Sequence, residues 1–271
     1  ASTKVVSDSV AKLYTAEAKY VRALSYLSLV QTYAKPFNLD KNALGVPLRL
    51  TPITSAGNND LKRSTVEEVY TQIIKDLNEA EIDLPTSYST SYLNTSRAHK
   101  ATAIALKTRV YLNMSQYQNV LNEGSKIVPS IAPFRYSAGA VTHALEANIL
   151  NVFTGSYTGF EAIFSIPFAN STTETPPSQF SLAFNYLSQP IIFLATLGIV
   201  GNSAFSDNQD ARSTLITFDA AKHKVLKKFA ISTAPFRDYV PVIRYAEVLL
   251  NCSEAAAKLN DINYSVELLK A

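Results

Sequence analysis

The sequence is poor in residues that mark several large classes of protein. It contains no tryptophan, 8 glycines in 271 residues and a single cysteine, Cys252. One cysteine cannot form a disulfide within the chain, and its place in a helical pattern predicts a small buried thiol. The low glycine content excludes collagen-like sequence. No apolar run reaches the roughly 18–20 residues of a membrane-spanning helix, the nearest approach being residues 190–200.

The charged residues show no clustering of one sign along the chain. Lys and Arg number 25 and Asp and Glu 22, which gives a net charge of +3 with the two signs interspersed. Without a basic stripe, the sequence argues against nucleic acid as a partner. The three histidines, His99, His143 and His223, are far apart in sequence, and no metal pair, nucleophile elbow or phosphate loop is present. We therefore expect no enzyme activity, no cofactor and no bound metal.

What the sequence has instead is helical periodicity. From Val242 onward, apolar and small residues recur at spacings of three, four and seven, including Ala246, Leu249 and Ala256. Alanine on the contact line lets a partner helix approach closely. The pair Asn260-Asp261 then ends the run, and a returning helix follows. The last thirty residues are thus predicted to form an antiparallel helix pair.

Two more helix pairs are predicted upstream. Residues 96–128 contain two amphipathic segments separated by a Ser-Gln break, a unit close to the roughly 34-residue period of tetratricopeptide repeats. Residues 16–33 form a helix whose partner is expected at 64–84, where Ser64 and Glu67 have the spacing of a capping box. The fold class is therefore mainly α, with tetratricopeptide-like helix pairs. Their spacing is too irregular for a plain solenoid.

The middle of the chain, residues 129–240, has a different texture. Short strand-like runs such as 162–168 and many aromatic rings lie among Ser, Thr, Asn and Gln, so we expect an irregular, loop-rich region with short strands. A sugar offers an apolar C–H face to a ring and hydroxyls to amides, which makes this region the candidate ligand surface. The same rings would also suit a core, and the missing tryptophan removes the largest stacking face. The candidate ligand residues are Tyr157, Phe160, Phe180, Phe184, Asn185 and Tyr186.

Two groups of charged residues invite other interpretations. Residues 206–212 carry oxygen ligands suited to Ca²⁺, but their spacing fits no EF-hand, and a turn with contacts between Asp210 and Arg212 is the favoured reading. Glu247 and Glu254 lie seven residues apart on one helix face. These two carboxylates, like Arg22 and Arg244, are expected to form ion pairs between helices, which fix register more than they stabilise.

Seven segments, in order, resemble motifs of the RagB/SusD family of nutrient-binding outer-membrane lipoproteins. The residues 16–37 resemble the family's "EA.FLRA..YF.LV..YG..P" helix, and 242–255 resemble its "IRYAEV.L..AEA" helix. The order of the matches is not free, which makes chance similarity a poor explanation. The other matching segments are GVPLRL (45–50, similar to a strand-like "G.PL"), 63–85, 101–128, EAIFSIPF (161–168, similar to the "E.IF.I" strand) and DAR (210–212).

The resemblance implies a role outside the cell. It implies a single SusD-like domain over 1–271, with a helical scaffold at 1–128 and 241–271 that faces a TonB-dependent, SusC-like transporter. The ligand would be an oligosaccharide, held by the region 129–240. Membrane association would come only through a lipid anchor that is absent from this chain, in a longer precursor. The family's ligand residues share no motif, so the six candidates rest on composition alone.

Two alternatives stay open. The same architecture could bind peptides, which the missing tryptophan makes more credible. The helix pairs alone would also suit a tetratricopeptide-type scaffold that binds other proteins in its grooves.

Overall fold

The structure is a computed structural model, and it divides into two compact units. Unit 1 comprises residues 1–142 and 245–271, and unit 2 comprises residues 143–244. Each unit is described by itself below. The residues that the structure describes are 5–57, 59–153, 158–168, 180–205, 210–233 and 238–271.

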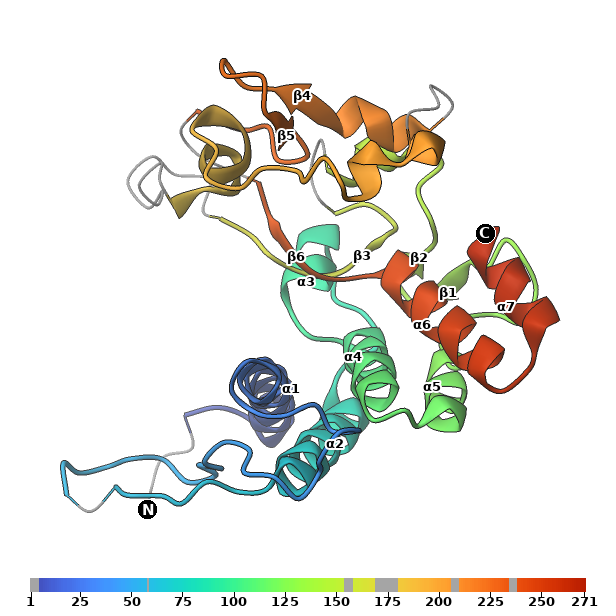
Figure 1. Cartoon of the computed structure of the whole chain (residues 1–271). Coiled ribbons are helices and arrows are strands. Elements are labelled where there is room, and N and C mark those ends of the chain that lie inside the picture. Colours follow the sequence, from blue (N-terminus) through green and yellow to red (C-terminus); the bar gives the residue numbers. More distant parts are fainter. Residues whose placement is uncertain (1–4, 58, 154–157, 169–179, 206–209, 234–237) are drawn as a thin grey trace. The chain divides into compact units, whose positions relative to one another are not determined.

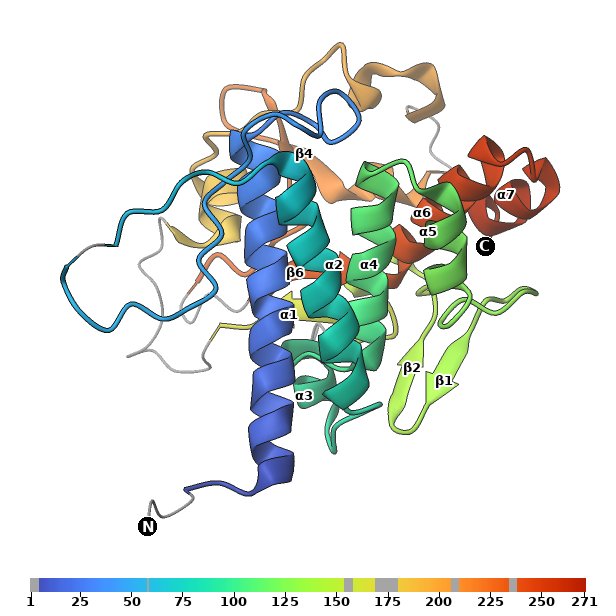
Figure 2. The same cartoon turned by 90° about the horizontal axis from the view of Figure 1, so that it is seen from below.

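Unit 1 is built from antiparallel helix pairs (Figure 1). The three predicted pairs are confirmed, since α1 packs on α2, α4 on α5 and α6 on α7. Figure 2 shows α1, α2 and α4 side by side along the unit. The mainly α fold class is therefore correct. The helices are α1 (Asp8–Tyr33), α2 (Val66–Asp83), the short α3 (Ser91–Ser96), α4 (Lys100–Asn113), α5 (Tyr117–Gly124), α6 (Tyr245–Lys258) and α7 (Ile262–Leu269).

The capping box of α2 lies one residue later than predicted. Thr65, not Ser64, is the N-cap: its hydroxyl accepts from the N–H of Glu68 at 3.2 Å, and the Glu68 carboxylate accepts from the N–H of Thr65 at 2.7 Å. The backbone of Ser64 is already engaged, because its N–H donates to Val46 and its carbonyl accepts from Gly45. The segment 45–50 also differs from expectation. It forms no strand, and the only bridge near it pairs Leu44 with Thr65.

The C-terminal helix begins at Tyr245, so the predicted start at Val242 is wrong. Residues Val240–Arg244 form strand β6, which pairs antiparallel with β3 (Ala162–Ile166), the strand expected within 161–168. β-Branched side chains favour the extended backbone, and β3 supplies hydrogen-bond partners that helical periodicity cannot reveal. Pro241 has no N–H to donate to the ladder, and the register of this ribbon is irregular.

Close packing between α5 and α6 depends on small side chains. A Cβ added at Gly124 would lie 2.3 Å from the Cys252 sulfur, so no larger residue fits here without movement. Cys252 is buried, as predicted, and burial raises the pKa of its thiol to about 12. Ala255 and Ala256 are also buried. The small-residue line read from the sequence is thus a true helix contact.

Ion pairs join neighbouring helices. Arg22 on α1 binds Asp76 on α2 at 2.6 Å, and Arg109 on α4 binds Glu247 on α6 at 2.7 Å. Both agree with the predicted role for Arg22 and Glu247. Glu254 differs, because it is exposed and makes no ion pair within the described part of the chain.

Unit 2 is irregular, as expected for the middle of the chain. Besides the β3–β6 ribbon it contains a second antiparallel ribbon of β4 (Ile216–Phe218) and β5 (Lys224–Leu226). Its apolar core consists of Phe153, Leu215 and Phe229. A hairpin of β1 (Tyr136–Ala138) and β2 (Val141–His143) leads into this unit from unit 1. The single-turn elements are η1 (Ile149–Val152), the π-helical η3 (Phe184–Ser188), η4 (Ile199–Gly201), η5 (Ser203–Phe205) and η6 (Ala211–Leu215).

Within the ranges given above, no helix combines the length and the apolar character that crossing a membrane requires. The same ranges contain no group of three His, Cys, Asp or Glu side chains suited to a metal ion. Asp207 and Asn208 of the oxygen-rich segment lie outside the described residues. The predicted turn contact between Asp210 and Arg212 is confirmed, since Arg212 donates to the Asp210 carboxylate at 2.6 Å.

Candidate functional site

The structure places the sequence-predicted ligand residues in three parts of unit 2. Phe184, Asn185 and Tyr186 come together in the π-helical turn η3 and are partly exposed. Phe180 lies just before this turn with 69% of its surface exposed. Phe160 belongs to the turn that precedes β3 and is 44% exposed. Tyr157 lies outside the described residues.

Two residues of η3 contact the protein itself. The Tyr186 ring packs against Phe229, with 5.9 Å between ring centroids, and so joins the apolar core of the unit. The Asn185 side chain donates to the Ser181 carbonyl at 2.9 Å. Phe180 and Phe160 are therefore the described members of the candidate set with the most exposed side chains, and Phe184 is partly exposed.

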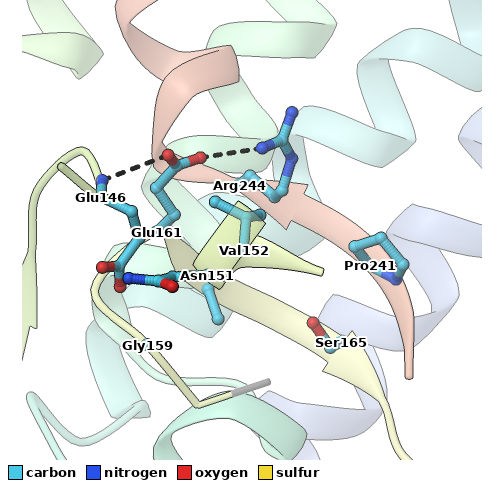
Figure 3. Close-up of a pocket in the computed structure, with 9 residues that line it drawn as sticks. Glu146, Asn151, Val152, Gly159, Glu161, Ser165, Pro241 and Arg244 are labelled. Atoms are coloured by element: carbon cyan, nitrogen blue, oxygen red, sulfur yellow. Dashed lines mark hydrogen bonds and ion pairs between the residues drawn. The ribbon is translucent and has the colours of Figure 1, made fainter. Parts of the chain in front are cut away.

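One small pocket of unit 2 surrounds Glu161 and Arg244 (Figure 3). The Glu161 carboxylate is buried and accepts from Arg244 at 2.8 Å and from the Glu146 N–H at 3.3 Å. Burial raises the pKa of Glu161, against the opposing effect of Arg244. The cavity volume is about 20 Å³, room for one water molecule and not for a sugar. The Glu161 carboxylate in this pocket therefore positions the Arg244 side chain.

Arg244 also lines a larger pocket, which we call the Phe153 pocket. Its volume is about 260 Å³, close to the lower end of small-ligand sites, which span about 300–1,000 Å³. Most of its wall is apolar and includes Phe153 and Leu215 of the core together with Phe205. An apolar concave wall with a few polar groups is typical of ligand sites.

Three cations line the Phe153 pocket, and their surroundings differ. Arg212 is paired with Asp210 at 2.6 Å, and Arg244 is paired with Glu161 at 2.8 Å. Lys228 has no carboxylate or hydrogen-bond partner among the residues the structure describes. Counted over the described residues, three cations meet two carboxylates, and the remaining positive charge resides on Lys228.

The Lys228 ammonium is half-buried against an aromatic ring. Its Nζ lies 4.0 Å from the centroid of the Phe153 ring, and the Arg244 guanidinium carbon lies 5.2 Å from the same centroid. Burial lowers the pKa of Lys228, and Arg244 lowers it further, while Glu161 acts in the opposite direction. The ring face attracts the cation, but it leaves the ammonium hydrogens without acceptor atoms.

Two further hollows, of about 300 and 900 Å³, lie at the C-terminal end of α1 in unit 1. Lys35 lines both of them, and it is paired with Asp40 at 3.2 Å. Arg63 lines the larger one and donates to the carbonyls of Gly45 and Leu44. Their cations are already engaged, so the Phe153 pocket is the better candidate for a ligand.

Sequence reasoning did not identify this pocket. Phe153, Lys228 and Arg244 are separated by 75 and 16 positions along the chain, and only the fold brings them together. The sequence offered one local signal, an amphiphilic KKF at 227–229 beside a short strand. That signal is too common to indicate a site.

The chain is similar to known proteins both in sequence and in structure. Residues 2–112 match the SusD-like family model described as "Starch-binding associating with outer membrane". A SusD superfamily protein from Bacteroides fragilis is 32% identical, with a TM-score of 0.81, over 95% of this chain and 56% of that chain. No curated protein matches the sequence.

Two more distant structures share the fold. A SusD superfamily protein from Bacteroides thetaiotaomicron is 23% identical over 99% of this chain and 60% of that chain, with a TM-score of 0.75. A laminarin-binding SusD-like protein is 22% identical over 93% of this chain and 61% of that chain, with a TM-score of 0.68. The chain thus spans between half and two thirds of the length of these structures.

Proposed function

Because this chain belongs to the RagB/SusD family, we propose that it is a binding protein that captures an oligosaccharide outside the cell and delivers it to a TonB-dependent outer-membrane transporter. In this proposal the protein is held at the outer membrane by a lipid anchor. The proposal contains no catalytic step and no cofactor. The alternative is a peptide ligand, and the test must distinguish it from an oligosaccharide.

The observation that carries the proposal is the Phe153 pocket. Phe153 and Phe205 line it, and a ring face can stack on the apolar C–H face of a sugar. Cationic hydrogen-bond donors at its edge can hold the sugar oxygens. One structural neighbour is a laminarin-binding protein, and laminarin is a glucan, which supports a carbohydrate as the ligand class.

The aromatic residues predicted from the sequence fit the proposal as a second contact surface. Tyr186 packs on the same apolar core that contributes Phe153 and Leu215 to the pocket wall. Phe180 and Phe184 belong to the same segment, in which Phe180 is exposed and Phe184 is partly exposed. We propose that this segment contacts further units of an oligosaccharide. Phe160, Asn185 and the undescribed Tyr157 stay candidates in this proposal.

Calorimetry with a panel of neutral and acidic oligosaccharides and a mixture of tryptic peptides tests the function. We expect glycan binding that Phe205→Ala weakens roughly tenfold, a loss of about 1.4 kcal/mol. Tyr92→Ala is the matched control, because Tyr92 is an exposed ring on α3 of unit 1. If peptides bind and no glycan does, the ligand is a peptide and not a carbohydrate. If Phe205→Ala and Tyr92→Ala have equal effects on binding, the Phe153 pocket is not the binding site.

A further inference from the structure

We infer that the Phe153 pocket selects an acidic sugar, whose carboxylate binds between Lys228 and Arg244 while its ring lies against the apolar wall. This inference rests on the proposed function, since it names the ligand class of the same site. A neutral glycan would leave the Lys228 charge without an anion. A uronic acid residue carries one carboxylate on a sugar ring and satisfies both the charge and the wall.

The charge balance of the pocket supports an anion. The charges of Arg212 and Arg244 are each compensated by a carboxylate within 2.8 Å, and Arg244 keeps further N–H donors for a ligand. Lys228 has none among the described residues and lies in a half-buried position, where a charge is costly to leave unpaired. A carboxylate placed there would gain a charge-assisted hydrogen bond from Lys228.

The geometry limits how the anion can enter. Lys228 and Arg244 both lie over the Phe153 ring, at 4.0 and 5.2 Å from its centroid. On the side of the small pocket, the Glu161 carboxylate accepts a hydrogen bond from Nη1 of Arg244. The Glu161 contact fixes the guanidinium before a ligand arrives, so less side-chain entropy is lost on binding. Such a site is charged, apolar and pre-formed at once.

The variant Lys228→Met tests the inference. Methionine keeps the length of the stem and removes the charge, and losing an unpaired half-buried cation should leave the fold as stable as before or more stable. The matched control is Lys227→Met, which changes net charge equally at an exposed neighbour that does not line the pocket. Far-UV circular dichroism confirms that each variant is folded.

The binding measurements use a galacturonic acid trimer and a galactose trimer of the same linkage. We expect the wild type to prefer the acidic trimer by at least about tenfold, and Lys228→Met, but not Lys227→Met, to abolish that preference. Lys228→Arg should retain it. Equal affinity for both trimers in the wild type, or an unchanged preference in Lys228→Met, overturns the inference and leaves the proposed function intact.

A second arm separates the sources of a carboxylate. Peptides with free and amidated C-termini are tested in the same assay, and tighter binding of the free peptides than of the acidic trimer overturns the sugar class. Failure of every glycan to bind counts against the proposed function itself.

The pH dependence gives an independent readout. The charged groups around Lys228 are Arg244 on β6 and Glu161 before β3, and Lys224 on β5 donates to Val200 of the pocket wall. Because the pKa of Lys228 is lowered, affinity for the acidic trimer should decrease as pH rises through it. Lys228→Arg stays protonated and should show no such decrease, and the same decrease in both proteins would contradict the inference.

Discussion

The ion pair between Arg22 and Asp76 offers a sharp test of what holds α1 to α2. Asp76 is fully buried, and its carboxylate accepts from Arg22 Nε at 2.7 Å, from Arg22 Nη2 at 2.6 Å and from Gln72 at 2.9 Å. The variant Arg22→Met removes two of these three donors and leaves the carboxylate buried.

The expected loss can be bounded from the structure. Removing one partner of a buried ion pair costs about 3–5 kcal/mol of unfolding free energy. The side chain of Arg22 is 32% exposed, so water can reach the vacated position and hydrate part of the carboxylate. We therefore expect Arg22→Met to lower the free energy of unfolding by about 2–4 kcal/mol.

Urea unfolding followed by circular dichroism at 222 nm measures this loss, and two variants control it. The first is Arg22→Met combined with Asp76→Leu, which removes both charges and should recover most of the stability. The second is Lys19→Met, which breaks the exposed pair with Glu79 between the same two helices and should have a much smaller effect. A double variant as unstable as Arg22→Met, or equal losses for Arg22→Met and Lys19→Met, would refute the reasoning.

Three further predictions concern packing, pH and a buried hydroxyl. Gly124→Ala should destabilise by about 1–3 kcal/mol in thermal unfolding, because its Cβ would meet the Cys252 sulfur, and adding Cys252→Ala should restore most of the loss; an additive double variant would contradict this contact. Burial lowers the pKa of His143 from 6.5 to about 4. The unfolded chain therefore binds the extra proton first, and unfolding free energy should decrease by up to about 3 kcal/mol as pH falls from 6.5 to 4, a decrease that should be smaller in His143→Gln. The buried Tyr245 hydroxyl lies 2.9 and 2.7 Å from two backbone carbonyls, so Tyr245→Phe should cost about 1–3 kcal/mol in urea unfolding, and a cost near zero would mean that water replaces the hydroxyl.

The helices of unit 1 could be predicted because their information is local. A buried stripe such as that of α1 repeats every three or four residues and is visible in any window of the sequence. Errors occurred where a distant partner decides the conformation. Arg244 of β6 pairs with Ala162, 82 positions earlier, and backbone hydrogen bonds of Ser64 with Gly45 and Val46 leave Thr65 as the cap of α2.

The buried charge on α4 shows the same limit. Lys107 lies within an apolar helix pattern, yet it is fully buried and binds the carboxylates of Glu81 and Glu123. Nothing near Lys107 in sequence indicates these partners. The Phe153 pocket is harder still to predict, because its charge balance depends on which carboxylate each cation meets after folding. Composition indicated a candidate ligand region, and only the fold identified the pocket.

The β3–β6 ribbon has a consequence for how proteins of this type can diversify. Ile166 and Val240 are paired across the ribbon, so the segment between them begins and ends at neighbouring positions. The segment also carries the core residues Leu215 and Phe229, which changes there must keep. Since the entropy of closing a flexible loop grows only slowly with its length, residues can be inserted in the connections around that core at little thermodynamic cost. A gene could therefore acquire a new ligand preference by recombination within this one segment, while its helices continued to evolve under a separate constraint.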